Sequence, residues 1–173
     1  MFEVAVDELD DYASGVVELL ERHGVTITNP APGQDLEILE ADDRSLSFEL
    51  NGALPDGRQP PLSTVAIRER FMPAPGHRIE RIEYEYELID HERDSRRAFH
   101  LHDADWFQRR FLVVVHEHCE RPVGHATCPH YHGTPVRDGF AAVETLLEVW
   151  TGPLPDCDAL TALERGGWTR SAF

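Results

Sequence analysis

The chain has 173 residues, of which 41% are hydrophobic and 28% are charged. That length suits one domain of ordinary size with a core of its own. No apolar run approaches the roughly 18 residues that a membrane helix needs, and the first residues lack the basic and apolar segments of a signal peptide. The sequence therefore predicts a single domain over residues 1–173, located in the cytoplasm and without a membrane partner.

The charge is strongly acidic and unevenly distributed. The chain carries 32 Asp and Glu against 16 Arg and no Lys, a formal net charge of −16. Residues 1–60 hold 14 acidic side chains and 3 arginines, whereas residues 91–121 hold six of each. Nucleic-acid binding depends on basic side chains that neutralise phosphates, so most of this surface should repel RNA and DNA. Residues 91–121 are the part best suited to an anionic ligand.

The first third of the chain reads as one helix followed by short strands. Residues 7–23 carry apolar side chains at three- and four-residue spacing and acids in the first turn, and Gly24 supplies a stop. The pattern after it predicts short β segments at 25–28, 36–40 and 45–50. The Pro- and Gly-rich residues 52–61 predict a loop.

The β signal is strongest between residues 62 and 118. Residues 62–71 form a candidate strand, and residues 79–89 alternate between apolar or aromatic even positions, such as Tyr84 and Tyr86, and charged odd positions, such as Arg81 and Glu85. Such alternation is typical of an antiparallel strand with one buried face. Further strands are expected at 96–102 and 109–118.

The register of the hairpin decides which side chains share a surface. A turn centred near Arg93 would place His100 opposite Tyr86 and His102 opposite Tyr84. The two tyrosines and the two histidines would then lie on one face, although a slip of one residue would move the whole set to the other face.

A second amphipathic helix is expected at 138–150 with Asp138 as its N-cap, and a short third helix at 156–165. The predicted fold is α+β, with an antiparallel sheet of five to seven strands centred on the meander at 79–118 and two main helices packed on one face. Within the domain, residues 1–60 form an acidic helix plus short strands, 61–151 the histidine-rich meander and helix, and 152–173 a C-terminal tail.

Histidines concentrate between residues 96 and 133, which hold seven of the ten in the chain. Six of them form three His-x-His pairs: His100 and His102, His116 and His118, His130 and His132. Residues two apart on a strand point to the same face, about 7 Å apart. The pattern therefore predicts a histidine-lined surface.

One interpretation of this surface is a metal site for zinc or another divalent transition metal, since histidine and cysteine are favoured ligands of such ions. Its candidate ligands are His116, His118, Cys128, His130 and His132. The spacing matches no zinc-finger pattern, and the alternative is a protein without a cofactor whose histidines are hydrogen-bonded along the sheet. The three cysteines are an odd number, and no structural disulfide is expected.

A second interpretation is general acid–base catalysis. Histidine transfers protons near neutral pH, tyrosine can orient or donate, and arginine can hold a phosphate. The candidate catalytic residues are His100, His102, His116, His118 and Tyr84, and the candidate substrate-binding residues are Arg96, Arg97, Arg109 and Arg110. This set would suit a metal-independent ribonuclease. The alternative for the arginines is a role as solvated partners of nearby aspartates.

The order of these motifs resembles the TumE-type family of toxin–antitoxin-associated proteins. The resemblance rests on IEYEYEL at 82–88, RAFHLHD at 97–103, a histidine pair ahead of PHYHG at 129–133, and the helix DGFAAVETLLEVW at 138–150. It covers residues 79–151 and leaves out the acidic N-terminal 78. It implies a short α+β protein of a prokaryotic toxin–antitoxin or related defence system, with an antitoxin-like protein partner.

Three classes of function therefore stay open. The first is a TumE-like protein that acts on RNA through a His/Tyr/Arg surface, the second a metal-binding protein that uses the His-x-His pairs, and the third a non-catalytic protein-interaction domain. A homodimer is compatible with all three.

Overall fold

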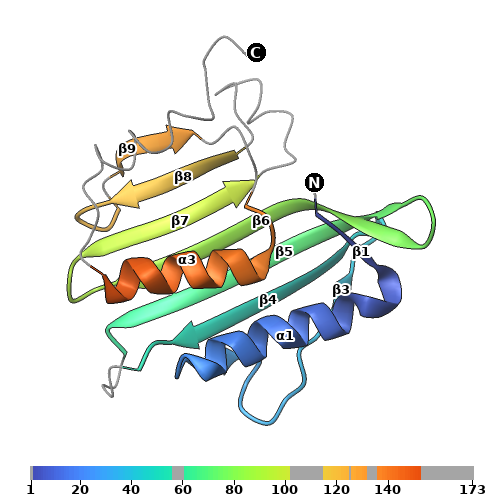
Figure 1. Ribbon diagram of the computed structural model, residues 1–173, viewed down its shortest axis with the longest axis horizontal. Helices are drawn as coiled ribbons and strands as arrows, with labels where there is room; N and C mark the ends of the chain where they lie inside the picture. Colours follow the sequence, from blue (N-terminus) through green and yellow to red (C-terminus); the bar gives the residue numbers. More distant parts are fainter. Residues whose placement is uncertain (1, 56–60, 102–114, 125, 132–135, 153–173) are drawn as a thin grey trace.

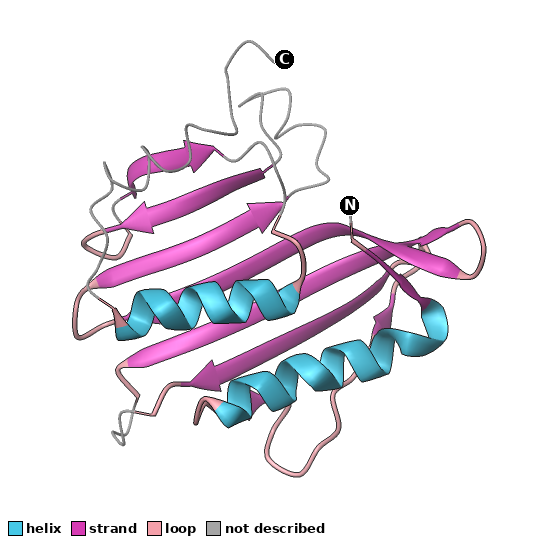
Figure 2. Cartoon of the chain, viewed as in Figure 1, coloured by secondary structure: helices cyan, strands magenta, loops and turns pink. Residues whose placement is uncertain are grey.

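The computed structural model describes residues 2–55, 61–101, 115–124, 126–131 and 136–152. These residues form an α+β structure in which one antiparallel sheet is accompanied by two helices (Figures 1 and 2). The elements are β1 Glu3–Ala5, a 3-10 helix Val6–Glu8, α1 Leu9–Arg22, β2 Thr26–Asn29, β3 Leu39–Glu40, β4 Leu46–Ala53, β5 Ser63–Ala74, β6 Arg78–Asp90, β7 Ser95–Leu101, β8 Val115–Glu120, β9 Ala126–Tyr131 and α3 Gly139–Thr151.

The sheet has nine strands in the described residues, with the main order β2-β4-β5-β6-β7-β8-β9. The short strands β1 and β3 lie off this path, paired with β6 and β4. The α+β class and the central meander are confirmed, and the expected five to seven strands are two too few. Short β segments were expected where β2 and β3 lie, so the strands without an expected counterpart are β1, which is three residues long, and β9. A strand as short as β1 leaves almost no periodic signal, and Pro129 weakens the strand signal of β9.

Both main helices begin and end close to where their sequence signals lie. In α1 the buried residues Leu9, Ala13, Val16, Leu19 and Leu20 form the apolar stripe, and Gly24 follows with φ +79°. Its start is later than expected because Val6–Glu8 form a 3-10 turn. In α3 the Asp138 side chain accepts a hydrogen bond from the Ala141 N–H, which confirms it as the N-cap. None of the described helices is long and apolar enough to cross a membrane.

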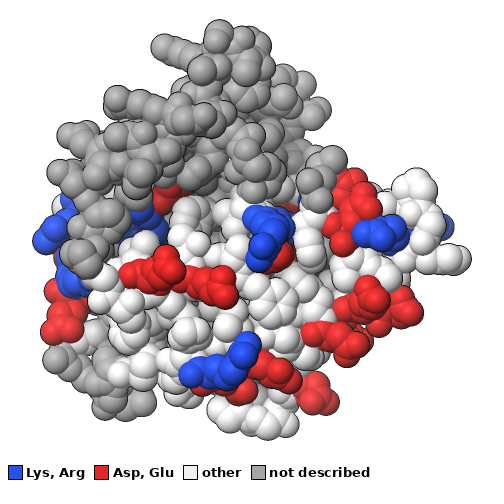
Figure 3. All heavy atoms as spheres, viewed as in Figure 1, with Lys and Arg blue, Asp and Glu red and all other residues white. Residues whose placement is uncertain are grey.

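The helices contact each other and different parts of the sheet. α1 contacts β2 and β4, and α3 contacts β6. The rings of Tyr12 in α1 and Phe140 in α3 are 5.7 Å apart. Acidic side chains are spread over the surface of the molecule that Figure 3 shows.

The core lies between the helices and strands β4, β5 and β6. Its largest fully buried side chains include Tyr86, Phe71, Leu50 and Ile67. Gly52, expected in a loop, lies in β4, where a Cβ would come within 2.5 Å of Val25 Cγ1. A larger residue at this position would have to displace the Val25 side chain.

Strand β6 contains a bulge that overturns one expectation. Arg70 pairs with Glu83 and Phe71 pairs with Arg81, so the register skips Ile82. A bulge of this kind shifts the alternation by one residue. Arg81, expected on the exposed face with Glu85, is therefore 2% exposed and lies on the same face as Tyr84 and Tyr86.

The hairpin between β6 and β7 overturns a second expectation. Asp90 pairs with Ser95, so the turn has the four residues 91–94, and its centre lies half a residue before Arg93. His100 pairs with Glu85, while Phe99 pairs with Tyr86 and Leu101 with Tyr84. The expected pairing of histidines with tyrosines is wrong by one residue, and His100 lies on the face opposite the tyrosines.

Asp90 holds this turn. Its carboxylate accepts hydrogen bonds from the Arg93 N–H, at 3.0 Å, and from Arg93 Nε. Arg93 in turn donates to the carbonyl oxygen of Gly152, at 3.0 Å, which ties the turn to the end of α3. Burial alone would raise the pKa of Asp90, but these hydrogen bonds outweigh it and hold the pKa below its ordinary value.

Asp90→Asn should destabilise the protein by about 1 kcal/mol at pH 7, because it removes charge-assisted hydrogen bonds. A carboxylate with a lowered folded pKa contributes stability above its unfolded pKa and loses it as the pH falls through the folded value. The difference between wild type and Asp90→Asn should therefore shrink between pH 5 and pH 2. Urea denaturation across this range measures it, with the exposed Asp35→Asn as control. A difference that does not change with pH would contradict this role.

Candidate functional site

Alternation along the central strands separates two faces of the sheet. Tyr86 pairs with Phe99, which pairs with Glu117, and these residues share the face that holds the core. Glu85 pairs with His100, which pairs with His116, in the opposite series. The side that carries Glu85, Arg96, His100, His118 and Glu120 is called the histidine face below.

Two imidazoles meet on the histidine face. The rings of His100 in β7 and His118 in β8 have centroids 4.8 Å apart. His100 Nε2 lies 3.6 Å from Glu85 Oε1, and His118 Nδ1 lies 3.5 Å from Glu120 Oε1. The side chains of His100 and His118 are 10% and 26% exposed. A carboxylate beside an imidazole orients the ring and stabilises its protonated form, so this arrangement can transfer protons.

Arg96 joins the two strands that carry these histidines to β6. Its Nη1 lies 2.6 Å from Glu120 Oε1, and its Nε bonds to Glu87. Burial would raise the pKa of Glu120, but hydrogen bonds from the Gly124 N–H and from Arg96 lower it. Glu120 is therefore ionised at neutral pH, beside His118.

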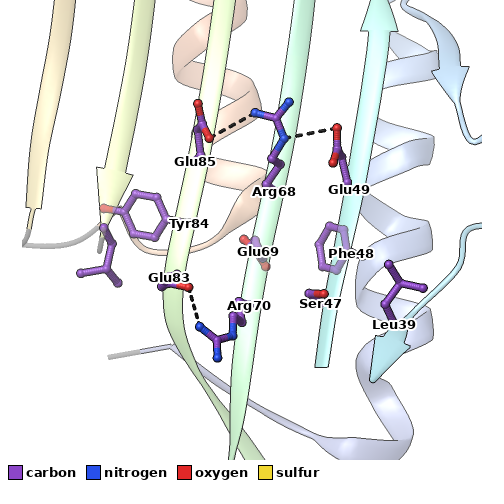
Figure 4. Close-up of a pocket in the computed structure, with 11 residues that line it drawn as sticks. Leu39, Ser47, Phe48, Glu49, Arg68, Glu69, Arg70, Glu83, Tyr84 and Glu85 are labelled. Atoms are coloured by element: carbon purple, nitrogen blue, oxygen red, sulfur yellow. Dashed lines mark hydrogen bonds and ion pairs between the residues drawn. The ribbon is translucent and has the colours of Figure 1, made fainter. Parts of the chain in front are cut away.

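A depression of about 350 Å³ adjoins the histidine face over strands β4, β5 and β6 (Figure 4). Within it Arg68 lies between two carboxylates, with Nε 3.2 Å from Glu49 and Nη1 3.1 Å from Glu85. Arg70 bonds to Glu83 at 2.9 Å and also to Asp43. Glu85 thus belongs both to this depression and to the surroundings of His100.

Carboxylates outnumber arginines on this side of the sheet. On this side Arg68, Arg70 and Arg96 each contact at least two carboxylates. The carboxylates that they contact are Asp43, Glu49, Glu83, Glu85, Glu87 and Glu120. A phosphate would therefore need other cationic groups, and the candidates Arg109 and Arg110 lie outside the described residues.

Two of the expected site residues lie on the core face instead. Tyr84 is 3% exposed, its ring stacks on Tyr86 at 4.6 Å, and its hydroxyl accepts a hydrogen bond from the Val136 N–H. Burial raises its pKa. Arg97 is buried and pairs with the buried Glu117. The structure therefore brings His100 and His118 together with Arg96 and separates them from Tyr84 and Arg97.

The expected metal ligands are described only in part. His132 lies outside the described residues, as does the candidate catalytic residue His102, and for His116, Cys128 and His130 the backbone alone is described. In the register of β8 and β9, His116 and His118 pair with Tyr131 and Pro129, whereas Cys128 and His130 pair with Cys119 and Glu117. The backbone thus divides the set between the two alternating series. Among the described residues, no group of three or more His, Cys, Asp or Glu could hold a metal ion.

A buried polar cluster on the core face was missed by the sequence analysis. Arg81 Nη1 donates to Glu69 Oε1 at 3.0 Å, and the Tyr12 hydroxyl donates to the same oxygen at 2.9 Å. The Tyr86 hydroxyl also bonds to it, and the Gly139 N–H donates to the Tyr12 hydroxyl at 2.7 Å. One carboxylate therefore joins β5 and β6 to α1 and the start of α3.

This cluster is sealed from solvent, because the side chains of Arg81 and Glu69 are 1% and 0% exposed. Burial raises the pKa of Glu69, against the lowering effect of Arg81 and the tyrosine hydroxyls, and it also raises the pKa of Tyr86 and Tyr12. One sequence signal pointed to a buried Glu69. It stands in the alternating series Val65, Ile67, Glu69, Phe71, whose three other members are apolar. Its closure from solvent marks the cluster as structural.

No family model matches the chain, and no curated protein or solved structure matches it either. The TumE-type resemblance therefore stays a prediction, and functional argument rests on the two faces of the sheet.

Glu69→Gln should destabilise the protein by about 3–5 kcal/mol, because it leaves the Arg81 charge buried without its counter-ion. Replacing both residues, as in Glu69→Leu with Arg81→Met, should cost less than the sum of the single changes. The half-exposed Glu49→Gln is the matched control and should cost under about 1 kcal/mol. Urea denaturation measures Glu69→Gln, Glu49→Gln, the double variant and the two single changes of which it is made. Equal losses for Glu69→Gln and Glu49→Gln would show that the buried pair does not hold the fold.

Proposed function

We propose that this chain is a TumE-like protein of a toxin–antitoxin or related defence system, and that its histidine face transfers protons during RNA cleavage without a metal. The observation that supports this most is the meeting of His100 and His118, with ring centroids 4.8 Å apart and a carboxylate beside each ring. Two imidazoles in such positions supply the general base and the general acid that phosphodiester cleavage needs.

The proposal includes an arrangement in which both helices pack on the core face and leave the histidine face open to a ligand. Its support is that Tyr12 of α1 bonds to Glu69, and that the first residue of α3, Gly139, bonds to Tyr12. Glu69 pairs with Tyr84 in the register, on the face of the buried tyrosines. A polar sheet face opposite the helices is the usual outcome in an antiparallel sheet of this kind.

In the proposed reaction, one imidazole takes the proton from a ribose 2′-hydroxyl as its oxygen attacks the adjacent phosphorus. The other imidazole donates a proton to the departing 5′ oxygen, which leaves a 2′,3′-cyclic phosphate. Glu85 and Glu120 orient the rings of His100 and His118 from 3.6 and 3.5 Å. Because the arginines described on this face contact carboxylates, Arg109 and Arg110 are the candidates to hold the phosphate. An antitoxin-like partner would inhibit the protein by covering this face.

Expression of the chain without a partner should arrest growth, and the purified protein should cleave RNA in the presence of EDTA. His100→Ala and His118→Ala should each lower the cleavage rate by about 10²–10⁴-fold, the usual contribution of a general acid or base. His23→Ala removes an exposed histidine at the end of α1 and should leave the rate unchanged. Circular dichroism should show that all variants are folded. Normal growth and intact RNA with folded, soluble wild-type protein would overturn the proposal.

A divalent transition metal on the same face is the second candidate. It is favoured by the direct pairing of His100 with His116 across β7 and β8, beside His118. Elemental analysis after native purification should then find close to one zinc or similar ion per chain, and His118→Ala should lose most of it. Metal-free protein that still cleaves RNA would remove this candidate and leave the first.

A further inference from the structure

Cys119 and Cys128 occupy directly paired positions on neighbouring strands. Cys119 lies in β8 and Cys128 in β9, and the antiparallel register places them opposite each other. Directly paired residues of an antiparallel ladder have Cα atoms about 4.5–5.5 Å apart, depending on the type of pair. A disulfide needs a Cα separation of about 4.4–6.8 Å, so the backbone meets this requirement without moving.

The surroundings of Cys119 are compatible with thiol chemistry. Cys119 is partly exposed. It belongs to the series of Arg97 and Glu117, on the face opposite His118. Oxidation at this position would therefore act on the strand pair from the side away from the histidine face.

We propose that Cys119 and Cys128 form a reversible redox pair, reduced at rest and joined as a disulfide across β8 and β9 by a peroxide oxidant. One thiolate attacks the peroxide, which yields a sulfenic acid and one water. The other thiol attacks the sulfenic sulfur, which forms the S–S bond and releases a second water. The two thiols together lose two electrons and two protons, and a dithiol reverses the reaction.

The expected consequence is a hairpin fixed at one end. The bond would lie close to the connection between the strands, beside the irregularity in register between Cys119 and Glu120. β8 carries His116 and His118, and β9 carries His130. The inference does not depend on RNA cleavage or metal binding, since it rests on the register alone.

The test uses the full chain, treated with hydrogen peroxide in the presence of EDTA and then with an alkylating agent under denaturing conditions. Reduced protein should take up three alkyl groups, and oxidised protein one, on Cys157. Cys157→Ser is the matched control and should fall from two groups to none. Cys119→Ser and Cys128→Ser should form no intramolecular disulfide.

Peptide mapping identifies the bond. The Arg121–Pro122 bond resists trypsin, so a protease that cleaves after Glu120 is needed to separate the two cysteines. The expected result is a linked pair of peptides containing Cys119 and Cys128, which separates on reduction. Three alkylated cysteines after peroxide, a bond to Cys157, or bonds only between chains would each overturn the proposal.

Discussion

The arrangement of the whole molecule depends on a carboxylate that has no access to water. Glu69 accepts hydrogen bonds from Arg81 and from the hydroxyls of Tyr12 and Tyr86. A buried charge without partners is strongly unfavourable, so each of these groups must be in place when the core closes. The strands, α1 and the start of α3 are thereby held in one relative position. An apolar core alone would tolerate small displacements of the helices, whereas this set of bonds does not.

The same sheet separates structural and functional roles by alternation. Along β6, Tyr84 and Tyr86 face the core, while Glu85 between them faces the histidines. One polar network therefore lies on each side of β6. On the core side Glu69, Arg81 and Tyr86 are buried, and the network has little room for a ligand. On the other side the carboxylates and imidazoles are partly exposed, so chemistry is more readily placed there.

Local periodicity was enough to predict much of the fold. The apolar stripe of α1, the N-cap at Asp138 and the alternation around Tyr86 are each written within a few neighbouring residues. The His-x-His spacing predicted a histidine-lined surface, but it did not predict that the rings of His100 and His118 would be the two that meet. In contrast, the place of Arg81 depends on a bulge, which arises from how two strands fit together. The partners of Glu69 are similarly distant, since Tyr12 is 57 positions away in the chain. A pattern within a few neighbouring residues cannot show a contact between residues that are so far apart in the chain.

The prediction of the sheet face on which His100 lies was wrong for a related reason. Hairpin register depends on turn length, and the four-residue turn is held by Asp90 and Arg93 through bonds that periodicity does not encode. Sequence could therefore predict that these histidines cluster, but not which neighbours they meet.

This turn also limits how the chain can change over evolutionary time. With β6 fixed, a register shift of one residue, caused by adding or removing a residue between Asp90 and Ser95, would turn β7 over. Phe99 would then meet Glu85 or Glu87, and His100 would face the core. Substitutions in the turn can be compensated one side chain at a time, but a change in its length alters every pairing of β7 at once. Among descendants of this chain, lineages that keep the histidine face should therefore keep the length of this connection while its sequence drifts. The spacing between two strands is then a heritable trait in its own right, on which selection acts separately from the identity of any residue.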